Sequence, residues 1–201
     1  AIFPAAMRWL WKDYPKPVAA GKSKNYMMND ILIPGESWQV AEGRPKVITS
    51  NSVTAHNGNT YSIKPGSPGK VYLVRPKSTK KVELDHSLQK PGGLCLTPDQ
   101  TQLYVTESDS HWVSLFSIQK DGTLTNKQRY NWLYSPDEED NSGAEGIKCD
   151  TAGRVYVATH LGVQISDQMG RVNVILPLPS GSASELWFDG QNADLLFVIS
   201  G

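Results

Sequence analysis

Short apolar runs alternate with turn residues through most of this chain. The runs at residues 71–74, 103–105, 112–118, 155–158 and 172–176 are rich in β-branched and aromatic side chains, which favour extended strands. Turn-forming pairs such as Asp121-Gly122 and Met169-Gly170 lie between them. No segment of about 12 residues places its apolar positions at the helical period. The pattern therefore predicts a nearly all-β fold from about residue 45 onward.

One aromatic position recurs along the strands. Tyr61, Tyr104, Tyr156 and Phe197 each follow a turn and lie within an apolar run. They are separated by roughly 40 to 50 residues, which is the repeat length of a four-stranded β-propeller blade. This spacing predicts a β-propeller.

The first 40 residues lack this alternation. The segment around Trp9 and Trp11 is aromatic, basic and interrupted by prolines. We interpret residues 1–40 as an N-terminal extension that lies over the main domain, and residues 41–201 as the β-propeller domain. The chain begins at Ala1 rather than Met, which fits either the removal of a secretion signal or an excised segment.

The charge balance narrows the possible partners. Lys and Arg total 20 and Asp and Glu total 20, so no net field attracts nucleic acid or an anionic membrane. No stretch approaches the roughly 20 apolar residues that cross a bilayer. A small neutral or weakly charged ligand fits better. Cys95 and Cys149 lie in apolar strands, which predicts buried core thiols rather than a disulfide.

Several catalytic motifs are absent from the sequence. It contains no Gly-x-Ser-x-Gly, no phosphate-binding Gly-x-x-x-x-Gly-Lys motif, no His-Glu-x-x-His and no Cys-x-x-Cys. Its four histidines share no metal-ligand spacing. Serine-hydrolase, P-loop and zinc-enzyme functions therefore have no support here.

The chemistry of a propeller is expected where the inner strands of its blades converge on a central channel. Glu145 immediately precedes a glycine at the start of one predicted inner strand. As a channel carboxylate it could bind a divalent ion or act as a base. A rim glutamate that hydrogen-bonds to a neighbouring strand is an equally good interpretation at this point.

Three segments of residues 91–200 form a recognisable set: Pro-Gly-Gly-Leu-Cys-Leu-Thr-Pro-Asp at 91–99, Leu-Tyr-Val-Thr-Glu-Ser at 103–108, and Ala-Glu-Gly-Ile-Lys-Cys-Asp at 144–150. In these segments the chain resembles the senescence marker protein-30, gluconolactonase and luciferin-regenerating enzyme family of six-bladed propellers. Asp-Gly-Thr-Leu at 121–124, Gly-Arg-Val-Tyr-Val-Ala at 153–158 and Ile-Leu-Pro-Leu-Pro at 175–179 follow in the order of the family. The resemblance implies an all-β propeller of the six-bladed type. Residues 41–201 suffice for only three to four blades of about 45 residues, so we expect the propeller in this chain to be incomplete.

The resemblance also implies an activity. Members of the family hydrolyse lactones with one divalent cation, usually calcium, which a Glu, an Asn and an Asp hold in the channel. The Asp also serves as the base for an ion-bound water, while the ion polarises the lactone carbonyl. Glu145 occupies the Asp position and is therefore expected to be both a metal ligand and the catalytic base. Glu42 matches the Glu loosely, as a second metal ligand, and Asn51 matches a substrate-binding Asn.

The chain departs from the family at three of these positions. Gly92 replaces the Asn ligand, Ser52 replaces an Asp that borders the substrate, and Glu145 is one methylene longer than the expected Asp. Such a change matters because misplacement by about 1 Å can cost a hundredfold in rate.

Two hypotheses follow. The first is a metal-dependent lactone hydrolase, a carboxylic ester hydrolase that acts with a divalent cation, calcium by resemblance. The second is a non-catalytic propeller that binds a small sugar-like ligand or a protein after losing its metal site. Under either one we expect no nucleic-acid or membrane partner, and self-association through open blade edges. The bacterial gluconolactonase-like relatives are often predicted to be exported, which implies a periplasmic or secreted protein.

Overall fold

The computed structural model describes residues 26–33, 35–41, 49–66, 68–190 and 194–200. The chain divides into two units, Ala1–Pro34 and Gly35–Gly201. The described part of the first unit contains the short helix α2 (Tyr26–Ile31), none of whose residues is buried. Most of the predicted extension, including Trp9 and Trp11, lies outside the described residues, so its boundary at residue 40 stays a prediction. No helix in the described ranges is long and apolar enough to cross a membrane.

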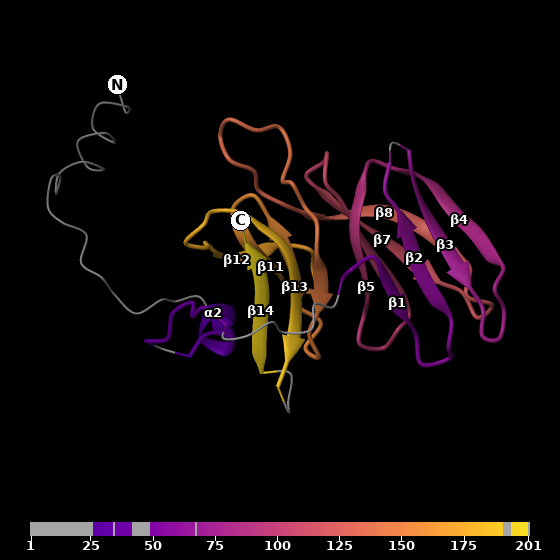
Figure 1. Ribbon diagram of the computed structural model, residues 1–201, viewed down its shortest axis with the longest axis horizontal. Helices are drawn as coiled ribbons and strands as arrows, with labels where there is room; N and C mark the ends of the chain where they lie inside the picture. Colours follow the sequence, from indigo (N-terminus) through magenta and orange to yellow (C-terminus); the bar gives the residue numbers. More distant parts are fainter. Residues whose placement is uncertain (1–25, 34, 42–48, 67, 191–193, 201) are drawn as a thin grey trace, which may run out of the picture. The chain divides into compact units, whose positions relative to one another are not determined.

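The second unit is built of antiparallel sheets (Figure 1). Three of them have four strands each, in simple up-and-down order, and a fourth has two strands. The first comprises β1 (Ser52–Thr54), β2 (Thr60–Lys64), β3 (Gly69–Val74) and β4 (Lys81–Leu88). The second comprises β5 (Pro91–Leu96), β6 (Gln102–Glu107), β7 (Trp112–Ile118) and β8 (Leu124–Trp132). The third comprises β9 (Ile147–Cys149), β10 (Val155–Thr159), β11 (Gly162–Ser166) and β12 (Val172–Leu176), and the last pairs β13 (Ala183–Asp189) with β14 (Leu195–Ser200).

This order confirms the predicted propeller, with three complete blades and half of a fourth. The recurring aromatic residue occupies the second strand of every blade: Tyr61 in β2, Tyr104 in β6, Tyr156 in β10 and Phe197 in β14. The repeat could be recognised because each blade places the same type of residue at the same point of the same strand. The first strand of each blade, namely β1, β5, β9 and β13, is the inner strand.

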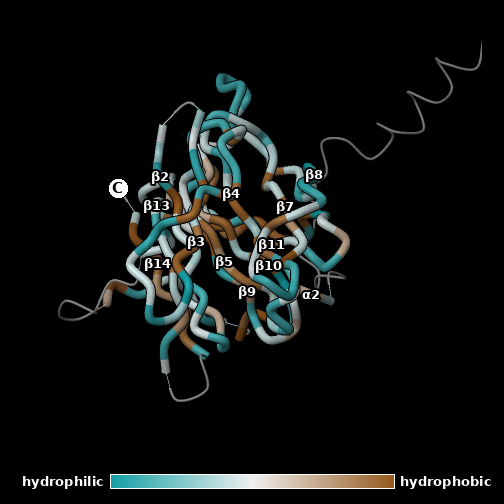
Figure 2. Tube along the Cα trace, turned by 90° about the vertical axis from the view of Figure 1, so that its right-hand side faces the viewer, coloured by the Kyte–Doolittle hydropathy of each residue, from teal (hydrophilic) through white to brown (hydrophobic). Residues whose placement is uncertain are grey.

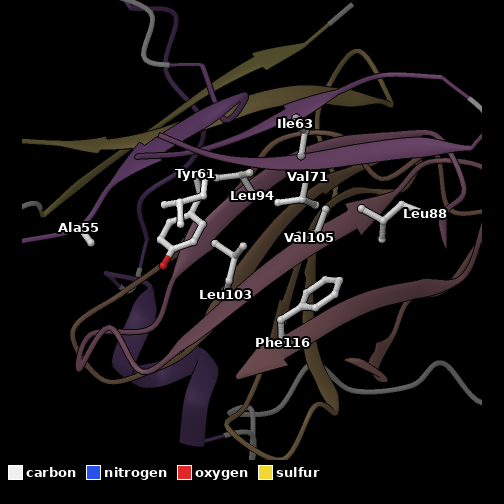
Figure 3. Close-up of a cluster of buried hydrophobic side chains, with 10 residues drawn as sticks. Ala55, Tyr61, Ile63, Val71, Leu88, Leu94, Leu103, Val105 and Phe116 are labelled. Carbon is white, nitrogen blue, oxygen red and sulfur yellow. The ribbon is translucent and has the colours of Figure 1, made fainter. Parts of the chain in front are cut away.

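The larger hydrophobic core lies between the first two blades. Figure 3 shows Ile63 and Val71 of the first blade facing Leu94, Val105 and Phe116 of the second. Tyr61 belongs to the same cluster and is fully buried, and its hydroxyl donates a hydrogen bond of 3.0 Å to the Gly122 carbonyl. Burial against the neighbouring blade therefore holds the two sheets face to face.

A second core lies between the second and third blades, and both cysteines belong to it or pack against it. Both thiols are free; Cys95 is buried and Cys149 is partly buried. Burial raises the pKa of the Cys149 thiol to about 12, and it also raises the pKa of the Cys95 thiol well above its ordinary value. The predicted core thiols are thus present, and in this state they are poor nucleophiles. Figure 2 shows hydrophobic stretches along the strands and hydrophilic ones in the turns.

Candidate functional site

The inner strands of neighbouring blades make direct backbone contact where they begin. Leu94 of β5 donates its N–H to the carbonyl of Ser50, just before β1, at 2.8 Å. Gly146, just before β9, donates its N–H to the carbonyl of Ser184 in β13 at 3.0 Å. Figure 1 shows β1 and β5 side by side. The openings of all four inner strands therefore meet in one region, which we call the central site.

Glycine makes this close approach possible. A Cβ on Gly93 would lie 2.7 Å from the Glu145 carbonyl oxygen and 2.8 Å from the Ser50 Cβ. A Cβ on Gly146 would lie 2.8 Å from the Glu185 Cα. At distances below 3.0 Å the neighbouring atoms must shift, and here they are backbone atoms or a Cβ rather than the far end of a flexible side chain. The central site is therefore lined by backbone at several points where another residue would project a side chain.

Glu145 lies at the entrance of the central site. Its N–H donates to the Ala158 carbonyl at 3.0 Å, and its carbonyl accepts from the Thr106 hydroxyl at 2.7 Å. The residue itself is exposed. Within the described residues its carboxylate makes no hydrogen bond or ion pair. Its backbone, rather than its side chain, thus joins it to the neighbouring strands, and the carboxylate remains available to a ligand.

Asn51 follows Ser50, the residue that packs against Gly93 in the central site. Its carbonyl accepts from the Ile63 N–H at 3.0 Å, and its side chain is exposed. Ser50 and the Glu145 backbone both lie beside Gly93, so Asn51 is adjacent in the chain to a residue of the central site. Glu42, the second metal ligand expected from the family resemblance, lies outside the described residues. The predicted roles of all three residues stay predictions.

A buried polar network is centred on Ser50 in the central site. Ser50 is fully buried, its hydroxyl donates to the Glu185 carboxylate at 2.6 Å, and its N–H donates to the other oxygen of that carboxylate at 2.7 Å. The Lys148 ammonium donates to the same hydroxyl at 2.7 Å, and the Ile147 N–H approaches it at 3.1 Å. One serine thus bridges a cation on β9 to an anion on β13.

The charge of Lys148 is affected by two opposing influences. Burial lowers its pKa below the ordinary value, because an ammonium group loses hydration when it is enclosed. The nearby Glu185 carboxylate acts in the other direction. An unpaired ammonium here would be costly, so the Ser50 bridge to Glu185 is what makes this position tolerable for a lysine.

These residues do not fit a divalent cation. The described part of the chain has no group of three or more His, Cys, Asp or Glu side chains placed to hold one. Gly92 replaces the Asn ligand of the family. A Cβ at this position would lie 2.6 Å from the Ala144 carbonyl oxygen, so no side chain fits there unless the neighbouring backbone shifts. Both oxygens of Glu185 are already bound by Ser50. The donor set that such an ion prefers is therefore incomplete among these residues.

An open hollow of about 450 Å³ lies away from the central site, at the turn between β7 and β8. Its lining includes Lys120 and Asp121. The Asp121 carboxylate accepts from both the N–H and the hydroxyl of Thr123, at 3.0 and 2.7 Å. This carboxylate closes its own turn, and we assign no chemistry to the hollow.

Sequence reasoning missed Ser50, Lys148 and Glu185. One signal was present, since Lys148 and Glu185 are charged residues inside inner strands that are otherwise largely apolar. Their pairing could not be read from the sequence, because the two residues are far apart in the chain and meet only through Ser50.

Comparisons with known proteins agree with this architecture. Residues 42–201 match the family model described as SMP-30/gluconolactonase/LRE-like region. A gluconolactonase of Xanthomonas campestris has a solved structure that superimposes with a TM-score of 0.64 at 22% identity, covering 83% of this chain and 60% of that one. Regucalcin of Agrobacterium tumefaciens, described as a calcium-binding protein, superimposes with a TM-score of 0.61 at 19% identity, covering 72% of this chain and 50% of that one.

A curated relative matches at a similar level of identity. The lactonohydrolase oryH of Aspergillus oryzae is 23% identical over 175 residues, which cover 73% of this chain and 35% of the relative. The chain thus spans about a third of that protein and about three fifths of the gluconolactonase structure.

Proposed function

Because the chain belongs to the SMP-30/gluconolactonase/LRE-like family, we propose that it hydrolyses lactones, with Glu145 as the general base. One observation carries the proposal. The backbone of Glu145 is hydrogen-bonded to neighbouring strands where the inner strands converge, and the residue is exposed there. Family membership gives lactone hydrolysis as the chemistry, and this geometry supports Glu145 as the residue that performs it.

The reaction needs a base and a positioned carbonyl. In the proposed step, Glu145 accepts a proton from water while the water oxygen bonds to the lactone carbonyl carbon. The ring C–O bond then breaks, and its oxygen takes up the proton held by Glu145 and becomes a hydroxyl group, giving a hydroxy acid. Asn51, which is exposed and follows Ser50 of the central site, is proposed to hydrogen-bond to substrate hydroxyl groups.

The divalent cation expected from the family resemblance enters no step of this proposal. The described residues lack its ligand set, and the predicted pair of Glu145 and Glu42 awaits a test that includes Glu42. In this proposal, calcium dependence is therefore separate from lactone hydrolysis, and the two are measured separately.

The test is hydrolysis of glucono-δ-lactone, followed by acid release above the rate in buffer alone. We expect Glu145→Gln to lower the rate at least about a hundredfold, which is the usual loss when a general base is removed. Glu138→Gln, at an exposed position in the loop after β8, is the control and should keep the wild-type rate. Equal rates for wild type and Glu145→Gln would show that Glu145 is not the base.

A second function is favoured by one observation. Gly92 leaves no room for the oxygen ligand of the family, as expected for a propeller that binds a sugar-like ligand without converting it. A folded wild-type protein that binds the lactone but opens it no faster than buffer would support this non-catalytic alternative.

A further inference from the structure

The central site contains a positive charge of its own. The ammonium group of Lys148 lies 2.7 Å from the Ser50 hydroxyl, and Ser50 contacts the three other inner strands. Lys148 is only partly buried, so its side chain is not sealed inside the core. Its charge therefore lies at the convergence of the blades, where the family resemblance places a metal ion.

The neighbouring groups are already committed to each other. The Ser50 hydroxyl donates to Glu185 and accepts from both Lys148 and the Ile147 N–H, which uses its full hydrogen-bonding capacity. One Glu185 oxygen also accepts from the Leu186 N–H at 3.1 Å. An ammonium group has three N–H bonds, and Ser50 takes one. Among the described residues, the other two have no hydrogen-bond acceptor and can donate to a ligand.

We propose that the ammonium group of Lys148 supplies the positive charge of the central site, donating a hydrogen bond to the carbonyl oxygen of a bound lactone in place of a divalent cation. The proposal rests on the lactone hydrolysis proposed above. When water attacks the carbonyl carbon, negative charge develops on that oxygen. A fixed cation in a partly dehydrated site stabilises this charge. Lys148 keeps its proton throughout and forms no covalent bond.

A metal ion would fit poorly beside this group. Two like charges at close range repel strongly in a partly buried site. Recruiting Glu185 as a ligand would also break its bonds to Ser50 and leave Lys148 with an unpaired charge. If Lys148 supplies the positive charge of the site, the incomplete set of metal ligands around it is explained as well.

The test measures binding of glucono-δ-lactam, which presents the same carbonyl oxygen but resists hydrolysis. Titration calorimetry compares wild type with Lys148→Met, a neutral side chain of similar length, in the presence of a chelator. We expect the affinity to fall about tenfold or more, since a hydrogen bond from a charged donor is lost. Lys120→Met, at an exposed position in the turn between β7 and β8, is the matched control and should bind as wild type does.

A second measurement needs no variant. Wild-type affinity for the lactam should be the same in chelator and in excess calcium. Equal binding by wild type and Lys148→Met would overturn the proposal, and so would lactam binding that requires calcium. Either result could occur while hydrolysis of glucono-δ-lactone persists, and the proposed function would then stand without Lys148. A wild-type protein that neither binds the lactam nor opens the lactone would instead refute the proposed function.

Discussion

Gly92 is the residue at which the family's chemistry and this fold diverge most clearly. Its Cβ would lie 2.6 Å from the Ala144 carbonyl oxygen and 2.7 Å from the Glu145 Cα. Both contacts are with backbone, which cannot rotate away as a side chain can. The loss of the Asn ligand is therefore coupled to how closely β5 approaches the segment before β9.

Restoring the family residue tests this coupling. We expect Gly92→Asn to destabilise the protein by about 1–3 kcal/mol, the usual cost of overpacking, and to lower the melting temperature by about 2–10 °C. The variant should gain no stabilisation from calcium. Ser180→Asn, at an exposed position in the turn between β12 and β13, is the control and should melt as the wild type does. A Gly92→Asn protein as stable as wild type, with a melting temperature that rises with calcium, would contradict the account.

At the scale of elements, the outer strands of the blades differ in how well they resist pairing with another chain. Charged residues lie along β4, such as Lys81 and Asp85, and along β8, such as Lys127 and Arg129. Charges of this kind discourage edge-to-edge association. Strands β12 and β14 have no charged residue, and β14, the second strand of the half-blade, pairs only with β13 within the described residues.

We propose that the predicted self-association uses the edge of β14. Leu195 and Ile199 are 54% and 37% exposed there, and antiparallel pairing of two copies would cover them. Ile199→Lys should shift the protein toward monomer in light scattering coupled to gel filtration, whereas Gln128→Lys on β8 should not. Concentration-independent monomer in the wild-type protein would refute the proposal.

The elements could be predicted from the sequence because their causes are local. Alternating apolar residues and turn pairs predicted β7 and β12 with the bounds they have in the structure, since each signal lies within a few residues. The central network could not be predicted in this way. Ser50 meets Glu185 only after the half-blade has packed against the rest of the propeller, and no periodicity marks a serine that will bridge two distant charges.

On the scale of the whole molecule, convergence of the inner strands is what turns separate sheets into a site. No single blade contains Asn51, Glu145 and Lys148 together with Glu185. The first blade supplies the segment with Ser50 and Asn51, the third supplies Glu145 and Lys148, and the half-blade supplies Glu185. The second blade contributes the glycines that let the others approach. The proposed activity therefore depends on the packing of all these blades.

The most direct test of this account is the rate of glucono-δ-lactone hydrolysis by the wild-type protein, first after exhaustive chelation and then with calcium added back. A site that uses Glu145 as base and Lys148 as its positive charge predicts hydrolysis above the buffer rate in chelator, with no increase on adding calcium. Hydrolysis that disappears on chelation and returns with calcium would show that a metal ion, rather than Lys148, carries the charge at the centre of the propeller.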